Sequence, residues 1–136
     1  MTEVPLSSPA AELRRARQLL EVAELLLTSG YFEDSVSRSY YATFHAACAL
    51  LGSIGRTVRT HEGLRAAIGE HFVRPGALDG KFARFLTRIA ADRNDADYSA
   101  VPSFSKADAE TTLTEARAFV EAAEGLAQPS APRQGP

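Results

Sequence analysis

Apolar residues recur every three or four positions along most of this chain, which is the period of an amphipathic helix. The first such series comprises Leu13, Ala16, Leu20, Ala23 and Leu27. It predicts a helix that begins at Ser8-Pro9, because serine caps free N–H groups and proline suits the first helical turn. Gly30 is expected to end this helix. The next helical series starts almost at once, so the two helices should form an antiparallel hairpin.

The second helix is predicted over Tyr31 to Leu51 and has two stripes. Its broad apolar stripe comprises Val36, Tyr40, Phe44, Ala47, Cys48 and Leu51. A second stripe, made of Arg38, Tyr41 and His45, runs beside it at steps of three and four residues. We therefore expect this helix to be buried on more than one side, with the aromatic and polar flank lining a groove.

Two further helices are predicted between Thr60 and Asn94. Thr60 would cap a short third helix with the inner residues Leu64, Ala67, Ile68 and Phe72. A fourth helix, from about Gly80, would turn Phe82, Phe85, Leu86 and Ile89 inward. It is expected to end near Arg93-Asn94, and the segment DADYSAVPSF would form a loop.

The last helix has a start signal of its own. Ser105 and Asp108, three residues apart, resemble a capping box. The apolar series that follows is Ala109, Leu113, Ala116, Val120, Ala123 and Ala127. Small residues on the first and last helices would allow a close approach, so these two helices are predicted to pack as neighbours.

No segment alternates with period two for long enough to form a strand. The predicted fold class is therefore all-α: an up-down helical bundle of four long helices plus one short helix. Residues 9–127 would form a single domain, with a flexible N-terminus at 1–8 and a disordered tail at 128–136.

Composition narrows the class of protein. The chain has 136 residues, of which 45% are hydrophobic and 24% charged, as in ordinary globular proteins. A single cysteine, Cys48, rules out a disulfide framework within the chain and a cysteine-based zinc site. We find no signal-peptide pattern and no apolar run near the roughly 20 residues that span a bilayer. A cytoplasmic protein without membrane contact is expected.

Charge is unevenly distributed. Residues 52–93 carry a net charge of +4 and the rest of the chain −6. A basic middle segment fits either an RNA or phosphate surface or charge pairing between helices. The pI near 5.9 argues against strong non-specific nucleic-acid binding.

The segment RNDADY, residues 93–98, can be interpreted in two ways. In a structural role, Arg93 would complement the helix C-terminus and pair with Asp97, and Tyr98 would pack against the bundle. In a functional role, Arg93 would face a phosphate, Asp97 would orient it, and the Tyr98 hydroxyl would donate a hydrogen bond.

The three histidines lie on different predicted elements. His45 could transfer protons only if it met Arg38 or Arg93 in a groove; otherwise it is an interior residue. His61 is expected to be solvent-exposed, and His71 suits the end of the third helix. No two histidines are one turn apart, and GSIGR lacks the residues of a phosphate-binding loop, so neither a metal nor a cofactor is expected.

These motifs together resemble a known family. The helix hairpin with SRSYYATFHAACALL, then THEG, RNDADY and S-x-x-D-A-E, is similar to the HEPN domain over about residues 10–127. The likeness is to its small stand-alone branch with a Tyr-Tyr-Ala-x-Phe-His helix and an Arg-x-x-x-Asp-Tyr motif. The resemblance implies a helical bundle that forms a homodimer with a cleft between protomers. It also implies a prokaryotic toxin–antitoxin or defence module with a nucleotidyltransferase partner, and nucleotide or RNA binding.

The resemblance also bears on catalysis. Many HEPN proteins are metal-independent RNases whose signature is an arginine followed, after a short spacer, by a histidine. Here Tyr98 stands in that place and no histidine follows Arg93, so only Arg93 and Asn94 carry over. In some HEPN toxins a tyrosine near this motif is adenylylated by the partner, which makes Tyr98 a candidate for modification.

Three functions stay open at this point. The first is a partner-binding HEPN protein whose dimer cleft binds nucleotide or RNA through Arg93, Asn94, Asp97 and Tyr98, with Arg38 and Tyr41 beside them. The second is an endoribonuclease toxin in which Arg93 acts with a displaced histidine, His45 or His61. The third is a purely structural helical interaction module.

Overall fold

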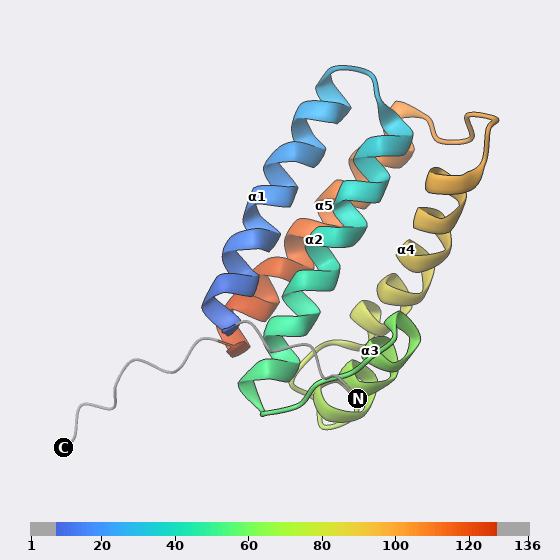
Figure 1. Ribbon diagram of the computed structural model, residues 1–136. Helices are drawn as coiled ribbons and strands as arrows, with labels where there is room; N and C mark the ends of the chain where they lie inside the picture. The colour runs from blue at the N-terminus through green and yellow to red at the C-terminus, as the bar shows by residue number, and fades with distance from the viewer. Residues whose placement is uncertain (1–7, 128–136) are drawn as a thin grey trace.

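The computed structural model describes residues 8–127, and every regular element in that range is helical. The elements are α1 (Pro9–Thr28), α2 (Phe32–Ser53), α3 (His61–Ile68), a π-helical turn η1 (Gly69–Val73), α4 (Gly80–Tyr98) and α5 (Lys106–Ala127). Four long helices lie along a common direction, and the short α3 lies across one end, beside the start of α4 (Figure 1). The predicted all-α bundle of four long helices and one short helix is confirmed.

The α1–α2 hairpin has the predicted start and turn. The Ser8 hydroxyl accepts a hydrogen bond from the backbone N–H of Ala11 at 3.1 Å, and Pro9 occupies the first turn. Gly30 has a φ of 88°, a conformation that only glycine adopts readily. The backbone N–H of Tyr31 then donates to the carbonyl of Leu26 at 2.8 Å. The chain thus reverses within a few residues, and α2 returns antiparallel to α1.

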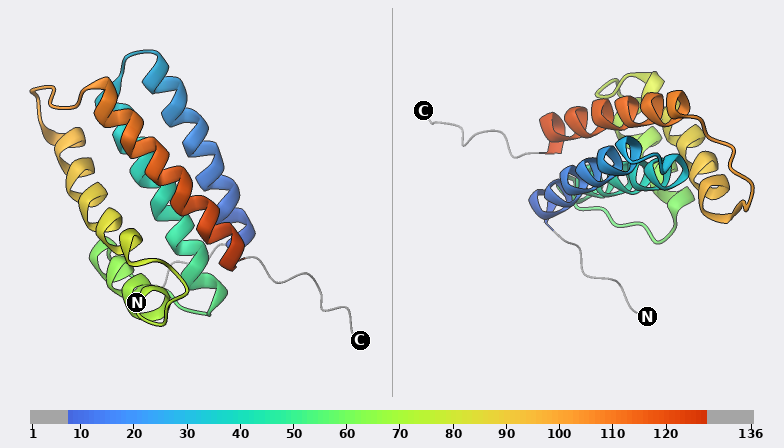
Figure 2. Two further views of the ribbon diagram at one scale, coloured as in Figure 1. Left: turned by 180° about the vertical axis from the view of Figure 1, so that it is seen from behind. Right: turned by 90° about the horizontal axis from the view of Figure 1, so that it is seen from above.

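Helix α2 is the central element of the bundle. It lies beside α1 and α5 (Figure 2). It also contacts α3 and α4, and over half of its 22 residues are buried. The prediction that α2 is buried on more than one side is confirmed. Helices α1 and α5 also contact each other, as their small residues predicted. The buried residues they contribute include Ala16, Ala23, Ala116 and Ala123, each 0% exposed.

Helix α4 is longer than predicted. It continues through Arg93 and Asn94 to Tyr98, and the backbone N–H of Ser99 still donates to the carbonyl of Asp95 at 2.9 Å. The expected end near Asn94 was wrong because no glycine or proline interrupts the helix before Pro102. The segment RNDADY is consequently the last part of α4, and the loop that follows spans only 99–105.

The loop from α4 to α5 is attached to the start of α2. One carboxylate oxygen of Glu33 accepts hydrogen bonds from the backbone N–H groups of Ser103 and Phe104, at 2.9 and 3.1 Å. At the far end of the loop, Ser105 and Asp108 cap α5 reciprocally, as predicted. Figure 1 shows this loop at the same end of the bundle as the α1–α2 turn. Glu33 therefore helps to fix the end of α4, where the RNDADY segment lies.

Replacement of Glu33 by glutamine tests this attachment. The backbone hydrogen bonds from Phe104 and Ser103 lower the pKa of Glu33, so its ionised form is the one that stabilises the fold. The native protein should therefore have this contribution in full above the ordinary glutamate pKa and lose it as pH falls through the lowered pKa of Glu33. At pH 7 the variant should lose about 1 kcal/mol of unfolding free energy. Urea unfolding at pH 7 and pH 3 measures both effects, and a difference of equal size at the two pH values would contradict them.

The described helices begin at Pro9 and end at Ala127, and the division of the chain into a domain at 9–127 with two end segments stays a prediction. The end segments predicted at 1–8 and 128–136 fall outside the described residues, except for Ser8. In residues 8–127, no helix is both long enough and apolar enough to cross a membrane.

Candidate functional site

Arg93 lies in the seam between α4 and α2, against two aromatic rings. Its guanidinium carbon is 4.9 Å from the centre of the Tyr40 ring and 5.8 Å from that of Tyr41. The side chain is 18% exposed, and its buried Nε has no hydrogen-bond partner. The nearest carboxylate is that of Asp97, one turn on, at 3.7 Å from the guanidinium. Arg93 is thus largely removed from water without a full set of partners.

Arg93 stays positively charged, but it has lost water without gaining a full set of hydrogen-bond partners. Burial lowers the pKa of the guanidinium, yet Tyr41, Tyr40 and Asp97, together with a hydrogen bond to Tyr40, outweigh burial and raise the pKa above its ordinary value. The aromatic faces compensate in part for lost water through cation–π attraction. Asp97 is beyond the distance of a good charge-assisted hydrogen bond. An anion that reached the guanidinium would supply the missing interaction.

His61 joins this group from α3. The Tyr40 hydroxyl and Nδ1 of His61 share a short hydrogen bond, and the two rings stack with their centres 5.6 Å apart. His61 also stacks on Phe44, with ring centres 4.7 Å apart. The prediction of a plain solvent-exposed His61 was therefore wrong. We call Arg93, Tyr40, Tyr41 and His61 the Arg93 cluster.

The electrostatics of the cluster keep both ring groups neutral. Burial, and then the positive charges of Arg93 and Arg65, lower the pKa of His61. Burial also raises the pKa of the Tyr40 hydroxyl, although Arg93 opposes that shift. At neutral pH, His61 is thus an uncharged imidazole beside an uncharged phenol.

In neutral His61, Nδ1 is engaged by Tyr40 and Nε2 remains available. The tautomer of the ring decides whether Nε2 accepts or donates a hydrogen bond. If Nδ1–H donates to the Tyr40 oxygen, the Nε2 lone pair is free to accept a proton. If the Tyr40 hydroxyl donates to Nδ1, then Nε2–H is a hydrogen-bond donor toward a ligand. The first arrangement suits general-base chemistry and the second suits anion binding.

The second predicted stripe of α2 contributes Arg38 and Tyr41 to the same region. The Arg38 guanidinium carbon lies 4.9 Å from the centre of the Tyr41 ring, so Tyr41 has both Arg38 and Arg93 near it. Sequence reasoning missed Arg65 as a site residue. Arg65 lines a small cavity of about 10 Å³ together with Tyr40, His61 and neighbouring apolar residues. Its only sequence signal was its place four residues after His61 on a helix.

The rest of the RNDADY segment is more exposed than Arg93. Tyr98 is 74% exposed, so the prediction that it packs against the bundle was wrong. Asn94 is also exposed. Asp97 contacts Arg93, as both interpretations of the segment expected. Because most of Tyr98 is exposed, this residue is accessible from solvent.

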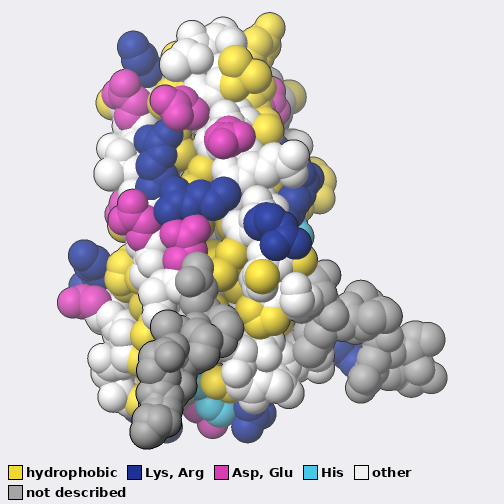
Figure 3. Space-filling view, turned by 90° about the vertical axis from the view of Figure 1, so that its left-hand side faces the viewer, with side chains coloured by type: hydrophobic (Ala, Val, Ile, Leu, Met, Phe, Trp, Pro, Cys, Tyr) yellow, Lys and Arg dark blue, Asp and Glu magenta, His cyan; other side chains and the backbone are white. Residues whose placement is uncertain are grey.

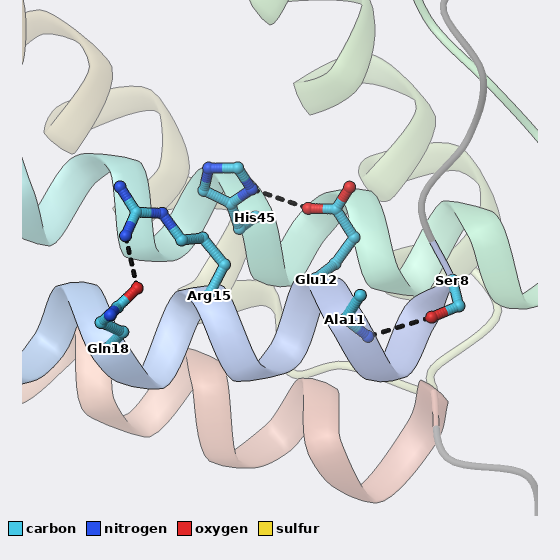
Figure 4. A network of polar contacts seen from close by, with 6 residues as sticks. All are labelled: Ser8, Ala11, Glu12, Arg15, Gln18 and His45. Carbon is cyan, nitrogen blue, oxygen red and sulfur yellow. Dashed lines mark hydrogen bonds and ion pairs between the residues drawn. The ribbon is translucent and has the colours of Figure 1, made fainter.

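His45 has a separate partner on α1. Its Nδ1 lies 2.6 Å from a carboxylate oxygen of Glu12, and Figure 4 shows the imidazole of α2 reaching toward that glutamate. Within residues 8–127, no hydrogen bond or ring contact joins His45 to Arg38 or Arg93. Burial, and secondarily Glu12, raise the pKa of the nearby Cys48 thiol to about 12, so it stays protonated. The candidate role of His45 beside Arg93 remains a prediction that these contacts do not support.

The face formed by α1 and α5 carries a second concentration of charge. An open groove of about 730 Å³ lies there, and Figure 3 shows basic and acidic side chains mixed on that side of the molecule. Arg17 forms two hydrogen bonds with Glu124, at 2.8 and 2.7 Å, and Arg117 bonds Glu24 at 2.6 Å. Both pairs join α1 to α5, so on this face the charges of these two arginines are neutralised by glutamates.

In the part of the chain that the structure describes, no three histidine, cysteine or acidic side chains are grouped as a metal site would require. The chemistry available at the Arg93 cluster is therefore that of a cation, a neutral imidazole and two phenols. That set can bind a phosphate group and move protons.

Comparisons with known proteins agree with the fold and the motifs. The model of the HEPN domain matches residues 11–126. A UPF0332 protein of Thermotoga maritima is 33% identical over 113 residues, which is 83% of this chain and 86% of that protein. A UPF0332 protein of Gloeobacter violaceus is 34% identical over 84% of this chain and 92% of its own. A protein of Methanocaldococcus jannaschii named "Putative toxin" is 32% identical over 78% of each chain.

Proposed function

The chain belongs to the HEPN domain family, and from this membership we propose that it is the toxin-like component of a prokaryotic toxin–antitoxin or defence module and binds RNA through the Arg93 cluster. Two relatives from Methanocaldococcus jannaschii carry toxin names, which supports the toxin-like role. The observation that carries RNA binding is the guanidinium of Arg93, which is 18% exposed and whose ion pair with Asp97 is a loose one of 3.7 Å. A phosphate oxygen is the acceptor that best fits such a donor.

The proposal includes partners of two kinds. The family resemblance implies a homodimer, in which two Arg93 clusters would face a shared cleft, and a nucleotidyltransferase-domain partner. The exposed Tyr98 hydroxyl, at the end of the helix that carries Arg93, would be accessible to such an enzyme. Incubation with a candidate partner and a nucleoside triphosphate, followed by intact-mass measurement, tests this part. A mass increase that Tyr98→Phe removes would support it, and an unmodified protein would oppose it.

RNA binding is tested with matched arginine variants. Fluorescently labelled single-stranded RNA is titrated with the native protein, Arg93→Gln and Arg14→Gln, and anisotropy is measured. Arg14 is an exposed arginine on α1, in the groove beside α5, and serves as the control for a lost positive charge. Binding that Arg93→Gln removes and Arg14→Gln preserves supports the proposal. Equal binding by all three proteins would contradict it.

RNA cleavage is the second candidate function, and the position of His61 favours it. Since Tyr40 contacts both Arg93 and His61, the structure brings a cation and a neutral imidazole to one ring. In the proposed reaction, Nε2 of His61 takes the proton of a 2′-hydroxyl, and that oxygen attacks the adjacent phosphorus. The bond to the 5′ oxygen breaks, the leaving oxygen takes up a proton from water, and a 2′,3′-cyclic phosphate remains. Arg93 would stabilise the negative charge on phosphorus in the transition state.

A pair of histidine variants tests this candidate. His61→Gln should reduce cleavage by about 10²- to 10⁴-fold, which is the usual contribution of a general base, whereas His45→Gln should have little effect. Cleavage is measured in a chelator by the yield of 2′,3′-cyclic ends. Because the pKa of His61 is lowered, the basic form persists below the ordinary histidine pKa near 6.5, and activity should fall only at lower pH. Loss of cleavage in His45→Gln instead would reassign the base.

A further inference from the structure

Resting on the proposed function, we propose that Arg93 is the middle member of an arginine track, Arg38, Arg93 and Arg65, that contacts successive phosphates of single-stranded RNA. The three residues come from α2, α4 and α3 and meet around Tyr40, Tyr41 and His61. The ligand of the site is then a polynucleotide segment and not a mononucleotide.

The first pair in the track shares one ring. The guanidinium carbons of Arg38 and Arg93 lie 4.9 and 5.8 Å from the centre of Tyr41, so they are at most about 11 Å apart. Arg38 is half-buried, and its one hydrogen bond within the described residues is a 3.3 Å contact with the Ser37 hydroxyl. The remaining guanidinium donors of Arg38 are left for a ligand.

The second pair shares Tyr40 and His61. Arg93 lies against the Tyr40 ring, and Arg65 lines the small cavity next to Tyr40 and His61. The positive charges of both arginines lower the pKa of His61, in addition to burial, so both lie close enough to act on its ring. At about 10 Å³ this cavity is too small for a ligand, so Arg65 would act at its mouth.

Some partly exposed arginines elsewhere in the fold have glutamate partners on other helices. Arg17 pairs with Glu124, and Arg88 pairs with Glu115. Among the described residues, neither Arg38 nor Arg65 forms an ion pair, and Arg93 has only the 3.7 Å contact with Asp97.

Arginines of the track that lack a close ion-pair partner raise the free energy of the ligand-free protein. Half-buried cations near one another repel and lose water, which raises the free energy of the ligand-free protein. Anions placed between them relieve both effects. A phosphodiester chain brings regularly spaced anions on one backbone, so it can reach all three guanidiniums at once, whereas a single phosphate reaches one or two.

The test compares RNA length and salt dependence. A twelve-nucleotide single strand, labelled for anisotropy, and an unlabelled diribonucleotide, followed by NMR shifts of the Tyr40 and His61 rings, are titrated with native protein and with Arg38→Gln, Arg65→Gln and Arg14→Gln. Each track variant should reduce the slope of log affinity against log salt for the twelve-mer by about 0.7. Each should weaken binding of the twelve-mer by a larger factor than binding of the diribonucleotide, and Arg14→Gln should match the native protein in both assays.

The outcomes separate this inference from the proposed function. If Arg93→Gln abolishes binding while the slopes of Arg38→Gln and Arg65→Gln equal that of the native protein, the track is wrong and the Arg93 site stands. If the two variants weaken binding of the diribonucleotide as much as binding of the twelve-mer, they act by distorting the Arg93 site, and the track is again wrong. If the native protein binds neither RNA, the proposed function and the track both fail. Circular-dichroism melting confirms that each variant is folded.

Discussion

Arg93→Met is expected to weaken RNA binding about 10- to 100-fold while leaving the free energy of unfolding unchanged or higher by up to about 1 kcal/mol. The binding loss follows from removing a charge-assisted donor to phosphate. The stability result follows from burial, because the native side chain is 18% exposed and its Nε has no partner. Methionine keeps the apolar contact with the tyrosine rings and has no charge to desolvate. Opposite effects on binding and stability are the mark of a residue retained for ligand binding.

Two measurements decide this prediction. Urea unfolding gives the stability and RNA anisotropy gives the affinity, with Arg88→Met as a control on the same helix. Arg88 pairs with Glu115 on α5 and lies outside the cluster, so its loss should leave binding unchanged. A destabilisation of Arg93→Met by about 2 kcal/mol or more, with RNA binding intact, would contradict the functional role.

A double-mutant cycle tests the alternative that Arg93 and Asp97 form only a structural ion pair. If Arg93 and Asp97 are only a structural pair, Arg93→Met and Asp97→Asn should show strong coupling in unfolding free energy and no effect on any ligand. The 3.7 Å separation and the partial exposure of Asp97 predict weak coupling instead, of the size found for surface pairs. Strong coupling would favour the purely structural helical module.

Phe119→Ala is expected to cost about 3–5 kcal/mol of unfolding free energy, which is a large part of the stability of a domain this size. Phe119 is 0% exposed, and its ring meets that of Phe82 edge-on at 5.7 Å between centres. It therefore helps to hold α5 to α4, the helix that carries Arg93. Truncation would leave a cavity between packed helices that neighbouring side chains fill only in part.

The control for this variant lies on the same helix. Leu126 is 40% exposed, so Leu126→Ala should change the unfolding free energy by only about 0.5 kcal/mol. Urea denaturation of both variants measures the contrast. If Phe119→Ala cost no more than Leu126→Ala, the predicted packing between α5 and α4 would be wrong.

The helices and their caps were predictable because their signals are local. In the caps at Ser8, Thr60 and Ser105, the side-chain hydroxyl accepts a hydrogen bond from a backbone N–H three residues further on. The heptad-like series of α1 and α5 marked their buried faces for the same reason. The end of α4 was misplaced because asparagine and aspartate are weak helix breakers, and nothing stronger follows Arg93 until Pro102.

The candidate site was only partly predictable. Arg93 was found from its motif, and Arg38 and Tyr41 from their stripe on α2. His61 was given an exposed role and Arg65 was missed, because both meet Tyr40 only when α3 packs across α2, after a loop whose path leaves no periodic signal. His45 was a candidate base because it shares a stripe with Tyr41, but its nearest partner is Glu12 of α1.

By itself, the sequence determined which segments are helices, which face of each is apolar, and that an arginine follows the apolar series of the fourth helix. Those properties depend on neighbours within a turn or two, where periodicity and capping act. Only the tertiary structure decided that His61 and Arg93 both contact Tyr40 while His45 faces Glu12. It also decided that Arg38 lies at Tyr41, Arg93 at Tyr41 and Tyr40, and Arg65 beside Tyr40 and His61. Such choices depend on contacts between residues far apart in the chain, and these are set by how the helices pack.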